Sequence, residues 1–286
     1  MSNIHPSSCI SPKAHVASDA EIGPFCVVEA EAVIGEGTVI ESHAVVRFGT
    51  RMGRENYLAE GVVLGGLPQH KQQSAQSGQL IIGDRNTFRE NVTVHRGLGK
   101  DDRTEIGDDN LLMVNAHVAH DCLLGNHTII ANNVMLAGHV TVGNSAYLSG
   151  AVGVHQFCRV GAFTMVGGQA RITKDVPPYV TVDGDSNLIV GLNLVGLRRG
   201  GFDRAQIQEL KAIYRVAFRS GLSWDDVIES LRKQFPTSLG QDMADFMEAT
   251  KRGCVQERRV PKQATIRLHL PESKSADEKQ QKRASA

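Results

Sequence analysis

The sequence predicts a mainly β protein: a parallel β-solenoid built from hexapeptides and followed by a small α-helical domain. Three observations carry this prediction. Apolar residues recur every six positions from Ile4 to Ile172, the 286-residue chain contains 29 glycines but only 5% aromatic residues, and the pattern becomes helical after residue 202. Many glycines and few large rings suit a chain of short strands joined by tight turns.

The six-residue repeat is the strongest of these signals. Stepping by six from Ile4 to Ile172 gives 29 positions, of which 26 are apolar and three (His70, Gln76 and Lys100) are not. At 41% hydrophobic residues, chance would place about 12 apolar residues there. A period of six fits neither a helical turn of about 3.6 residues nor the two-residue alternation of an ordinary strand. It is typical of a β-solenoid in which each hexapeptide forms one short strand and one corner.

Three hexapeptides should form one triangular lap. Residues 18 apart in the sequence would then lie above each other at roughly 4.8 Å, the ordinary spacing between strands. The three polar exceptions fall in two excursions, residues 67–80 and 97–104, after which the repeat resumes in phase. We expect both segments to leave the solenoid as loops that contribute to the functional site, because loops carried by a regular scaffold commonly do.

The repeat ends at "KDVPPYV", whose two prolines cannot donate to a β-ladder. Asp203, with Gln206 three residues later, predicts a helix N-terminus, and Gly221 predicts its end. The segments "SWDDVIESLRKQF" and "QDMADFMEATKRG" predict two more helices. We therefore expect a hexapeptide domain at 1–183, a helical domain at 184–256 and a polar, disordered tail at 257–286.

Composition restricts the class of partner and the location. Lysine plus arginine and aspartate plus glutamate both number 31, so the net charge of zero gives no reason to expect nucleic acid or a charged membrane. No apolar run is long enough for a transmembrane helix, and the N-terminus "MSNIHPSSC" lacks the pattern of a secretory signal. Five scattered cysteines without C-x-x-C spacing favour reduced thiols in a cytoplasmic protein.

The segment "NAHVAHDC", residues 115–122, carries the candidate chemistry. One full lap leads from His120 to Gly138 and from Asp121 to His139, so an imidazole should lie one strand spacing from a glycine backbone. A base beside an available N–H is what acyl transfer to a hydroxyl needs. The base accepts the hydroxyl proton, the N–H stabilises the oxyanion, and an adjacent carboxylate orients the base.

Other interpretations of the histidines stay open at this point. Three more histidines (His95, His117 and His155) extend the band over neighbouring laps, whereas isolated ones (His5, His15, His43 and His127) are more simply solvated turn residues. Converging histidines could instead bind zinc, as in a trimeric enzyme of the carbonic anhydrase type, and a chelator would then abolish activity. A non-catalytic scaffold is a further alternative, but it leaves the block around His120 unexplained.

Several sequence blocks, taken in order, resemble one known family. They are "IGPFCVV", "IGDRNTFRENVTVHRG", "NLLMVNAHVAHDC", "ANNVMLAGHVTVG", "GVHQFCRVGAFTMVGG" and "DVPPYV". The chain resembles the acyl-[acyl-carrier-protein]–UDP-N-acetylglucosamine O-acyltransferases, which catalyse the first step of lipid A synthesis, from about residue 4 to residue 252.

The resemblance implies a fold and a reaction. The fold would be a left-handed parallel β-helix, assembled as a homotrimer with its sites between neighbouring subunits. The reaction would be direct transfer of an acyl group, often 3-hydroxylated, from acyl-carrier protein to the glucosamine 3-position of UDP-N-acetylglucosamine. No metal and no cofactor are implied.

The resemblance also implies roles for individual residues. His120 would be the general base, Asp121 its assistant and Gly138 the donor of the oxyanion-hole amide. Binding of the sugar nucleotide would fall on Gln69, Lys71, His95, His117, Asn193, Arg198 and Arg199. Contacts to the carrier arm and the hydroxyacyl group would fall on His139, His155 and Gln156, and Gly168 would set the acyl chain length.

The departures from the family pattern lie on the sugar-nucleotide side. The family loop "QDLKY" reads Gln69-His70-Lys71-Gln72-Gln73 here, a family glutamate is Val195, and the second arginine of a family pair is Gly200. These differences motivate an alternative, a related acyltransferase that uses a 3-amino sugar or another nucleotide sugar. Acyl chain length and ester versus amide product are left open.

Overall fold

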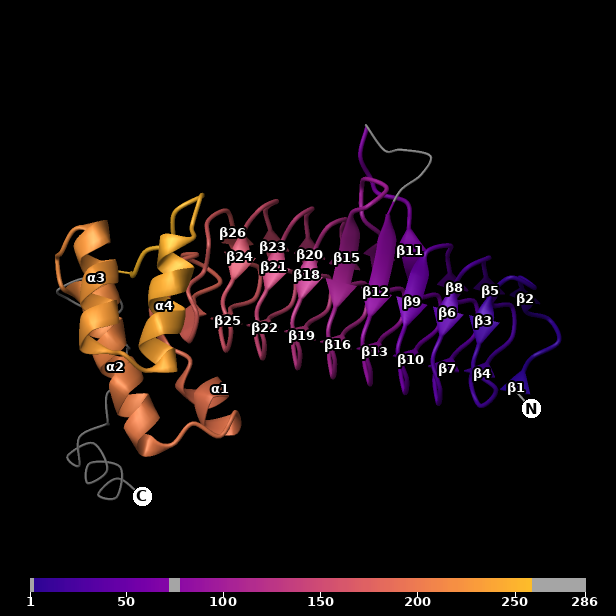
Figure 1. Ribbon diagram of the computed structural model, residues 1–286, viewed down its shortest axis with the longest axis horizontal. Coiled ribbons are helices and arrows are strands. Elements are labelled where there is room, and N and C mark those ends of the chain that lie inside the picture. Colours follow the sequence, from indigo (N-terminus) through magenta and orange to yellow (C-terminus); the bar gives the residue numbers. More distant parts are fainter. Residues whose placement is uncertain (1–2, 72–77, 259–286) are drawn as a thin grey trace, which may run out of the picture.

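The computed structural model describes residues 3–71 and 78–258. Within these residues the chain winds into a prism whose three sides are β-sheets, and four helices lie at its C-terminal end (Figure 1). Each lap adds one strand to each sheet in turn, and the strands pair in parallel except for the last pair. This arrangement confirms the predicted parallel β-solenoid followed by helices.

The three sheets are named A, B and C in the order in which the chain first meets them. Sheet A consists of β1 (Asn3–Ile4), β4 (Glu21–Ile22), β7 (Val39–Ile40), β10 (Tyr57–Leu58), β13 (Thr87–Phe88), β16 (Leu111–Leu112), β19 (Ile129–Ile130), β22 (Tyr147–Leu148), β25 (Met165–Val166), β27 (Val180–Val182) and β28 (Ile189–Leu192). Sheet B consists of β2 (Cys9–Ile10), β5 (Val27–Val28), β8 (Val45–Val46), β11 (Val63–Gly66), β14 (Thr93–His95), β17 (His117–Val118), β20 (Met135–Leu136), β23 (Gly153–Val154) and β26 (Arg171–Ile172). Sheet C consists of β3 (His15–Val16), β6 (Val33–Ile34), β9 (Thr50–Met52), β12 (Gln79–Ile82), β15 (Arg103–Ile106), β18 (Leu123–Leu124), β21 (Thr141–Val142) and β24 (Arg159–Val160). The edges where the chain passes between sheets are called the A–B, B–C and C–A corners.

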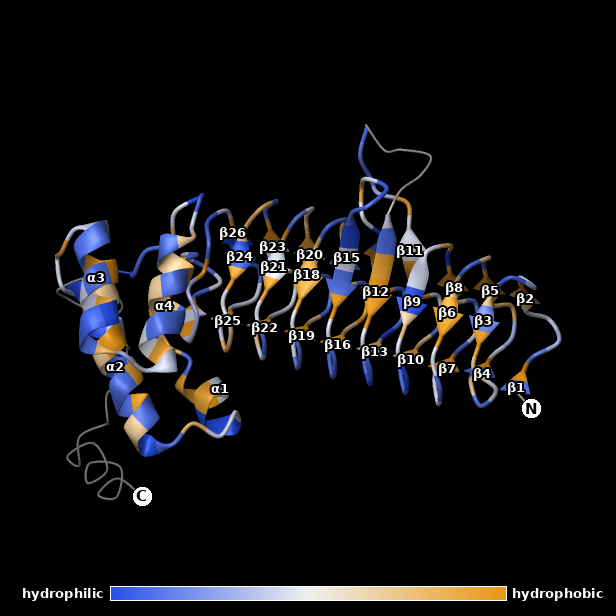
Figure 2. Cartoon of the chain, viewed as in Figure 1, coloured by the Kyte–Doolittle hydropathy of each residue, from blue (hydrophilic) through white to orange (hydrophobic). Residues whose placement is uncertain are grey.

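The six-residue repeat forms the core of the prism. From Ile22 to Ile172 every apolar residue of the repeat is at most 4% exposed. Those at positions 4, 10 and 16 are partly buried, because the first lap has a neighbour on one side only. Figure 2 shows hydrophobic residues recurring in the short strands along the prism, although some strands, such as β15 and β24, are largely hydrophilic in this view. Burial of one apolar residue per hexapeptide therefore holds successive laps in register.

Glycine often follows the buried apolar residue because the next lap comes too close for a side chain. A Cβ on Gly83 would lie 2.1 Å from Asp108 Oδ1. That oxygen accepts a hydrogen bond from the Asp84 N–H at 2.7 Å, and Asn126 and Asn144 repeat the bond in the following laps. Glycine followed by aspartate or asparagine thus joins the laps from Gly83 to Asn144 at the C–A corner.

The corners contain residues in the left-handed backbone conformation. At the B–C corner these include Asp121 (φ 61°), His139 (φ 61°) and Phe157 (φ 63°). In laps without an excursion, the N–H of such a residue commonly donates to a carbonyl oxygen in the corner of the preceding lap, as His139 does to His120 at 3.0 Å. Phe25 instead donates to Ser7 Oγ at 3.1 Å. These bonds connect the corners of neighbouring laps.

Both excursions leave from the B–C corner. The first is residues 67–78, between β11 and β12, and the second is residues 96–102, between β14 and β15. The predicted ends at 80 and 104 were too late, because β12 and β15 are four-residue strands that pair along their whole length. Residues 72–77 lie outside the described part of the chain.

The C-terminal part begins with a hairpin that extends sheet A. β27 and β28 pair in antiparallel, and the predicted domain boundary at 183/184 falls between them. The helices are α1 (Leu194–Arg199), α2 (Arg204–Arg219), α3 (Trp224–Gln234) and α4 (Ser238–Glu248). The predicted capping box of Asp203 and Gln206 is present at α2, whereas α1 was not predicted. None of the helices in the described part has the length and apolarity that a membrane crossing requires.

The predicted tail needs one correction at its start. Arg258 N–H donates to the Ile189 carbonyl at 2.8 Å, and the Glu257 carboxylate accepts from the Tyr214 hydroxyl at 2.7 Å. Residues 257 and 258 thus belong to the ordered C-terminal part, because they satisfy polar groups of β28 and α2. The rest of the predicted tail lies outside the described residues.

Candidate active site

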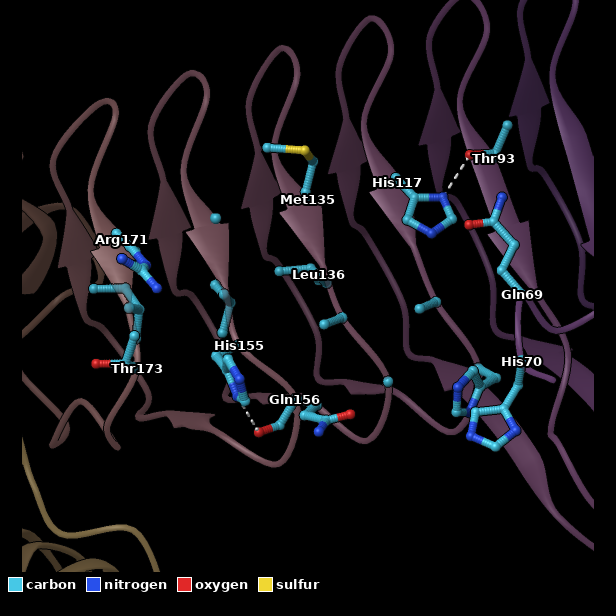
Figure 3. A pocket seen from close by; sticks show the side chains of 17 residues that line it. Gln69, His70, Thr93, His117, Met135, Leu136, His155, Gln156, Arg171 and Thr173 are labelled. Atoms are coloured by element: carbon cyan, nitrogen blue, oxygen red, sulfur yellow. Dashed lines mark hydrogen bonds between the residues drawn. The ribbon is translucent and has the colours of Figure 1, made fainter. Parts of the chain in front are cut away.

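A groove of about 740 Å³ runs along sheet B beside the B–C corner (Figure 3). It is lined by Gln69, His70, Thr93, His117, Ala119, His120, Met135, Leu136, Ala137, Gly138, Gly153, Val154, His155, Gln156, Arg171, Ile172 and Thr173. Six of the predicted site residues are among them: Gln69, His117, His120, Gly138, His155 and Gln156. The excursions leave the solenoid from this same corner, as expected for loops that serve the site.

One row of outward-facing residues forms the side of the groove on sheet B. The pairing of β14, β17, β20, β23 and β26 places Thr93, His117, Met135, Gly153 and Arg171 in register. At roughly 4.8 Å per strand, the row covers about 14 Å from His117 to Arg171. It changes from polar at Thr93 and His117 to apolar and open at Met135 and Gly153, and ends at the Arg171 guanidinium.

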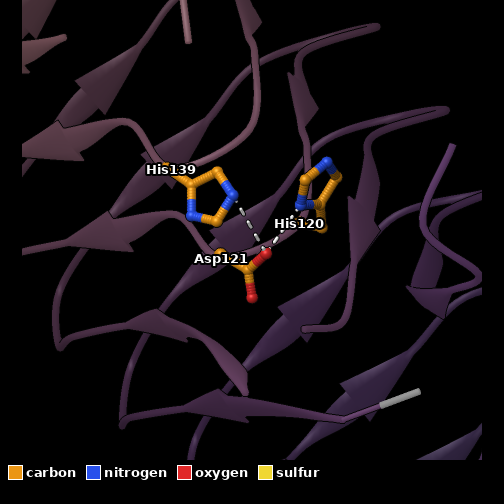
Figure 4. Close-up of side chains that lie close together, drawn as sticks. All are labelled: His120, Asp121 and His139. Carbon is orange, nitrogen blue, oxygen red and sulfur yellow. Dashed lines mark hydrogen bonds and ion pairs between the residues drawn. The ribbon is translucent and has the colours of Figure 1, made fainter. Parts of the chain in front are cut away.

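His120 and Asp121 form a hydrogen-bonded pair at the B–C corner. His120 Nδ1 lies 2.6 Å from Asp121 Oδ2, and the two side chains are 12% and 9% exposed (Figure 4). A short bond to a carboxylate fixes a proton on Nδ1 and leaves Nε2 as the basic nitrogen of the ring. The pair thus has the orientation that a general base requires.

Gly138 lies against the His120 ring, as the stacking of consecutive laps predicts. A Cβ on Gly138 would lie 2.6 Å from His120 Cε1 and 2.8 Å from Nε2, so a side chain there would displace the imidazole. Within residues 3–71 and 78–258 the Gly138 N–H has no hydrogen-bond acceptor. The predicted proton acceptor and the predicted oxyanion donor therefore lie in adjoining laps.

His139 supports the pair from the next lap. Its ring meets the His120 ring edge-on at 5.2 Å, and its Nε2 lies 3.6 Å from Asp121 Oδ2. The His139 ring also stacks on Phe157 with the ring centroids 4.5 Å apart. Phe157 was not predicted as a site residue, although one further lap from His139 points to it.

His95 and His117, two of the predicted site residues, lie next to each other on β14 and β17 of sheet B. Their rings meet edge-on at 4.9 Å, and His117 Nδ1 is hydrogen-bonded to Thr93 Oγ1 at 2.8 Å. Burial, with a smaller contribution from the neighbouring histidines, lowers the pKa of His95 to about 4. Burial also lowers the pKa of His117. His95 Nδ1 is buried and has no hydrogen-bond partner among the described residues.

The start of the first excursion folds back over the groove. Gln69 lies near His117 and Thr93, and the His70 ring meets the His120 ring at 5.7 Å (Figure 3). Lys71 is exposed and does not line the groove, while residues 72 and 73 lie outside the described part of the chain. Among the described residues that depart from the family pattern, His70 is thus the one whose ring meets that of the predicted base.

His155 and Gln156 line the groove two laps beyond the base. His155 Nδ1 lies 3.1 Å from the Gln156 carbonyl oxygen. Next to them, Arg171 and Thr173 close the lining of the groove and were not predicted. Successive laps from His117 lead to Met135, Gly153 and Arg171, so the repeat itself contains the signal that places Arg171 in this row.

The remaining predicted residues do not lie with His120 on this chain. Gly168 is in the A–B corner between β25 and β26. Asn193 lies at the C–A corner, where its amide donates to the Phe163 carbonyl at 2.9 Å and accepts from the Gly196 N–H at 3.0 Å as the N-cap of α1. Arg198 and Arg199 follow at the end of the same helix. The three predicted groups therefore lie on three different edges of the prism.

Gly200, a departure from the family pattern, has a local structural reason. A Cβ there would lie 2.5 Å from the Phe163 ring, so a side chain would require the ring to move. Val195 is 57% exposed on α1, and no contact in the structure explains its identity.

A metal ion is the other chemistry that the histidines could support. His120, Asp121 and His139 place one ligand atom each within 4.8 Å of the others. However, the 2.6 Å between His120 Nδ1 and Asp121 Oδ2 is the length of a strong hydrogen bond. Two ligands of a tetrahedral zinc ion, each about 2.1 Å from the metal, would lie roughly 3.4 Å apart. The pair therefore fits a shared proton better than a shared zinc ion.

Comparison with protein families matches both parts of the chain. Residues 13–48 and 103–138 match the bacterial transferase hexapeptide family, described as six repeats. Residues 175–255 match the second domain of UDP N-acetylglucosamine O-acyltransferase.

Relatives match over most of the chain. The acyl-[acyl-carrier-protein]–UDP-N-acetylglucosamine O-acyltransferase of Halorhodospira halophila is 48% identical over 258 residues, which cover 90% of this chain and 100% of the relative. The enzyme of the same name from Paracidovorax citrulli is 49% identical over 259 residues, covering 88% and 99%.

Solved structures agree. The UDP-N-acetylglucosamine O-acyltransferase of Moraxella catarrhalis superposes with a TM-score of 0.84 at 40% identity, covering 89% of this chain and all of the other. The corresponding structure from Acinetobacter baumannii gives 0.85 at 39%, with the same coverage. The predicted left-handed parallel β-helix is the fold of these structures.

Proposed function

Since the chain belongs to the family of acyl-[acyl-carrier-protein]–UDP-N-acetylglucosamine O-acyltransferases, we propose that it catalyses that reaction. It transfers an acyl group, commonly 3-hydroxylated, from acyl-carrier protein to the glucosamine 3-hydroxyl of UDP-N-acetylglucosamine, the first step of lipid A synthesis. The observation that carries the proposal is the His120–Asp121 pair lying against Gly138.

The geometry supports a direct transfer. His120 Nε2 accepts the proton of the sugar 3-hydroxyl while its oxygen attacks the thioester carbon, and Asp121 stabilises the resulting imidazolium. The Gly138 N–H donates to the oxyanion of the tetrahedral intermediate. When the intermediate collapses, the carbon–sulfur bond breaks and the carrier thiolate takes the proton back from His120. The products are the sugar ester and the free thiol.

Replacement of the base tests the proposal. We expect His120→Ala to lower kcat for transfer from 3-hydroxyacyl-carrier protein to UDP-N-acetylglucosamine by about 10² to 10⁴, the usual contribution of a positioned base. The exposed His127 at the C–A corner provides the control, and His127→Ala should transfer at the wild-type rate. A His120→Ala enzyme within a few-fold of wild type would refute the assignment.

The second candidate function, acyl transfer to a 3-amino sugar or to another nucleotide sugar, differs from the first in the acceptor. The names of the relatives specify an O-acyl product, which favours a hydroxyl over an amine. The His70 ring beside His120 is the observation that favours a different sugar, because an imidazole can donate and accept hydrogen bonds where the family pattern has an acceptor-only carboxylate. Parallel assays with UDP-N-acetylglucosamine and its 3-amino analogue, read by product mass, distinguish an ester from an amide.

We also propose that the active unit is a homotrimer with its sites between neighbouring subunits. The support is that the residues predicted for one site lie on three different edges of a single prism. In a three-fold assembly, the edge of one subunit that carries Asn193 and Arg199 and the edge that carries Gly168 can face the His120 groove of a neighbour. Five free cysteines in the described residues support the cytoplasmic location proposed for the protein.

A further inference from the structure

The backbone of Asp121 is held differently from the same corner residue in the next two laps. His139 donates its N–H to the His120 carbonyl at 3.0 Å, and Phe157 donates to the Gly138 carbonyl at 3.1 Å. In both cases the acceptor is the residue immediately before the corner residue of the preceding lap: His120 comes before Asp121, and Gly138 comes before His139. For Asp121 the corresponding position is Asp102. The Asp102 carbonyl is the acceptor of the Gln79 N–H at 3.0 Å, because the second excursion has replaced the regular corner.

A side chain takes the place of that carbonyl. The Asp121 N–H donates to Thr104 Oγ1 at 2.8 Å, and Thr104 is fully buried on β15. The carboxylate is held from the same region, because Asp121 Oδ1 accepts from the Leu98 N–H at 3.1 Å. This leaves Oδ2 for the 2.6 Å bond to His120. Two of the three hydrogen bonds that orient Asp121 thus come from the second excursion and the strand that follows it.

We infer that Thr104 is a positioning residue of the acyl-transfer site. Asp121 has a left-handed backbone (φ 61°), which is unfavourable for a residue with a side chain unless its surroundings hold it. Without the Thr104 oxygen, the buried N–H would lose its acceptor and the peptide could turn toward another one. The carboxylate would then move relative to His120, although Thr104 itself neither lines the groove nor touches His120. The inference rests on the proposed function of His120 and deepens it.

Thr104→Val tests the inference because it keeps the shape of the side chain and removes the hydrogen-bond acceptor. We expect kcat to fall by about 10- to 100-fold, as for loss of an orienting group, while KM for both substrates stays within about two-fold. Thr104→Ser restores the hydroxyl and should transfer near the wild-type rate. In hydrogen exchange, the Asp121 amide should be protected in the wild type and in Thr104→Ser but not in Thr104→Val.

Thr164→Val is the matched control for loss of a buried hydroxyl. Thr164 is equally buried, and its hydroxyl donates to the Pro177 carbonyl at 2.9 Å, at the C–A corner. The Thr164→Val variant should therefore have the wild-type kcat. If Thr104→Val does not fold, Thr104→Ala removes the same acceptor without a bulky replacement, and the variant that folds decides the question.

The outcomes separate this inference from the proposed function. An inactive His120→Ala together with a fully active Thr104→Val would overturn the role of Thr104 and leave the base in place. An active His120→Ala would overturn both. A rise in KM with unchanged kcat in Thr104→Val would also overturn the inference, since it would indicate a binding role.

Discussion

At the scale of single residues, His95 and His117 show how burial affects the protonation of histidines in and beside the groove. Burial lowers the pKa of each ring because it disfavours the charged imidazolium, and it thus favours the neutral form. A neutral imidazole can donate one hydrogen bond and accept another, which suits the uncharged hydroxyl and amide groups of a sugar. At low pH the two histidines lower the free energy of unfolding, because they bind protons in the unfolded chain that they do not bind in the folded one.

The low pKa of His95 predicts a pH dependence of stability. Between pH 6.5 and about 4 the unfolded state binds a proton at His95 and the folded state does not, so the free energy of unfolding falls as the pH is lowered through this range. Above pH 6.5 the full stability is present. A shift of this size corresponds to about 3 kcal/mol, lost by pH 4. Urea unfolding at pH 7.5 and at pH 4.5 measures the difference.

A non-titrating replacement isolates the contribution of His95. His95→Gln should lose less stability than the wild type over the same pH interval. His127→Gln is the control, because the His127 side chain is 64% exposed, and it should behave like the wild type. Equal losses in His95→Gln and wild type would contradict the explanation.

The placement of His120 next to Gly138 could be predicted from the sequence, whereas the groups that support Asp121 and His139 could not. His120 and Gly138 are one lap of 18 residues apart, so the repeat alone indicates that a base lies next to a glycine amide. Thr104 does not, because its bond to Asp121 depends on the path of the second excursion, which has no repeat. Phe157 was reachable by the same lap arithmetic, but an aromatic residue in a corner carries no chemical signal of its own.

At the scale of elements, the close approach of consecutive laps explains the glycine that follows many buried apolar residues. At Gly83 a Cβ would meet both the Asp108 carboxylate and, at 2.8 Å, the Gly107 carbonyl oxygen. The carboxylate cannot move away without giving up its hydrogen bond to the Asp84 N–H. The glycine is therefore required by the stacking of two laps and not by the conformation of one.

Replacement of this glycine should weaken the prism. We expect Gly83→Ala to lower the free energy of unfolding by about 1–3 kcal/mol, the usual cost of overpacking. Gly150→Ala is the matched control, because its Cβ would find Asn132 O at 3.6 Å, an ordinary contact, and its melting temperature should be unchanged. Equal melting temperatures for Gly83→Ala and the wild type would show that the laps can separate at no cost.

The elements with a sequence period were predictable, and those without one were not. The strands follow from the repeat and α2 from its capping box. By contrast, α1 has six residues, too few for a periodic signal, and depends on the Asn193 cap and on burial of Leu197. The excursions were located by their broken phase. Their ends were misplaced because β12 and β15 lengthen through pairing with each other, which no single segment reveals.

At the scale of the whole molecule, the separation of the predicted residues has a consequence for assembly. His120 lies at the B–C corner, Gly168 at the A–B corner, and Arg199 beyond Asn193 at the C–A corner. One prism cannot bring three of its own edges together. If all these residues serve one reaction, the site must be shared between chains, as proposed above.

Mixed assemblies test the shared site. His120→Ala and Arg199→Ala should each be poorly active alone, but when they are unfolded and refolded together in equal amounts, about a quarter of the clefts in random trimers combine an intact His120 with an intact Arg199 from a neighbour. Activity should therefore reappear on mixing, in particles with the mass of three 31.0 kDa chains. A mixture no more active than its components would mean that the two residues of a cleft come from the same chain, or that Arg199 lies outside the site.

The most direct measurement of the central claim is an experimental structure of the enzyme with the acylated sugar nucleotide bound. We expect the sugar 3-oxygen at about 3 Å from His120 Nε2, within hydrogen-bond reach. We also expect the acyl carbonyl oxygen on the side of Gly138, about 3 Å from the backbone nitrogen. A product bound with its ester away from these two groups, or with another residue against the 3-oxygen, would contradict the account.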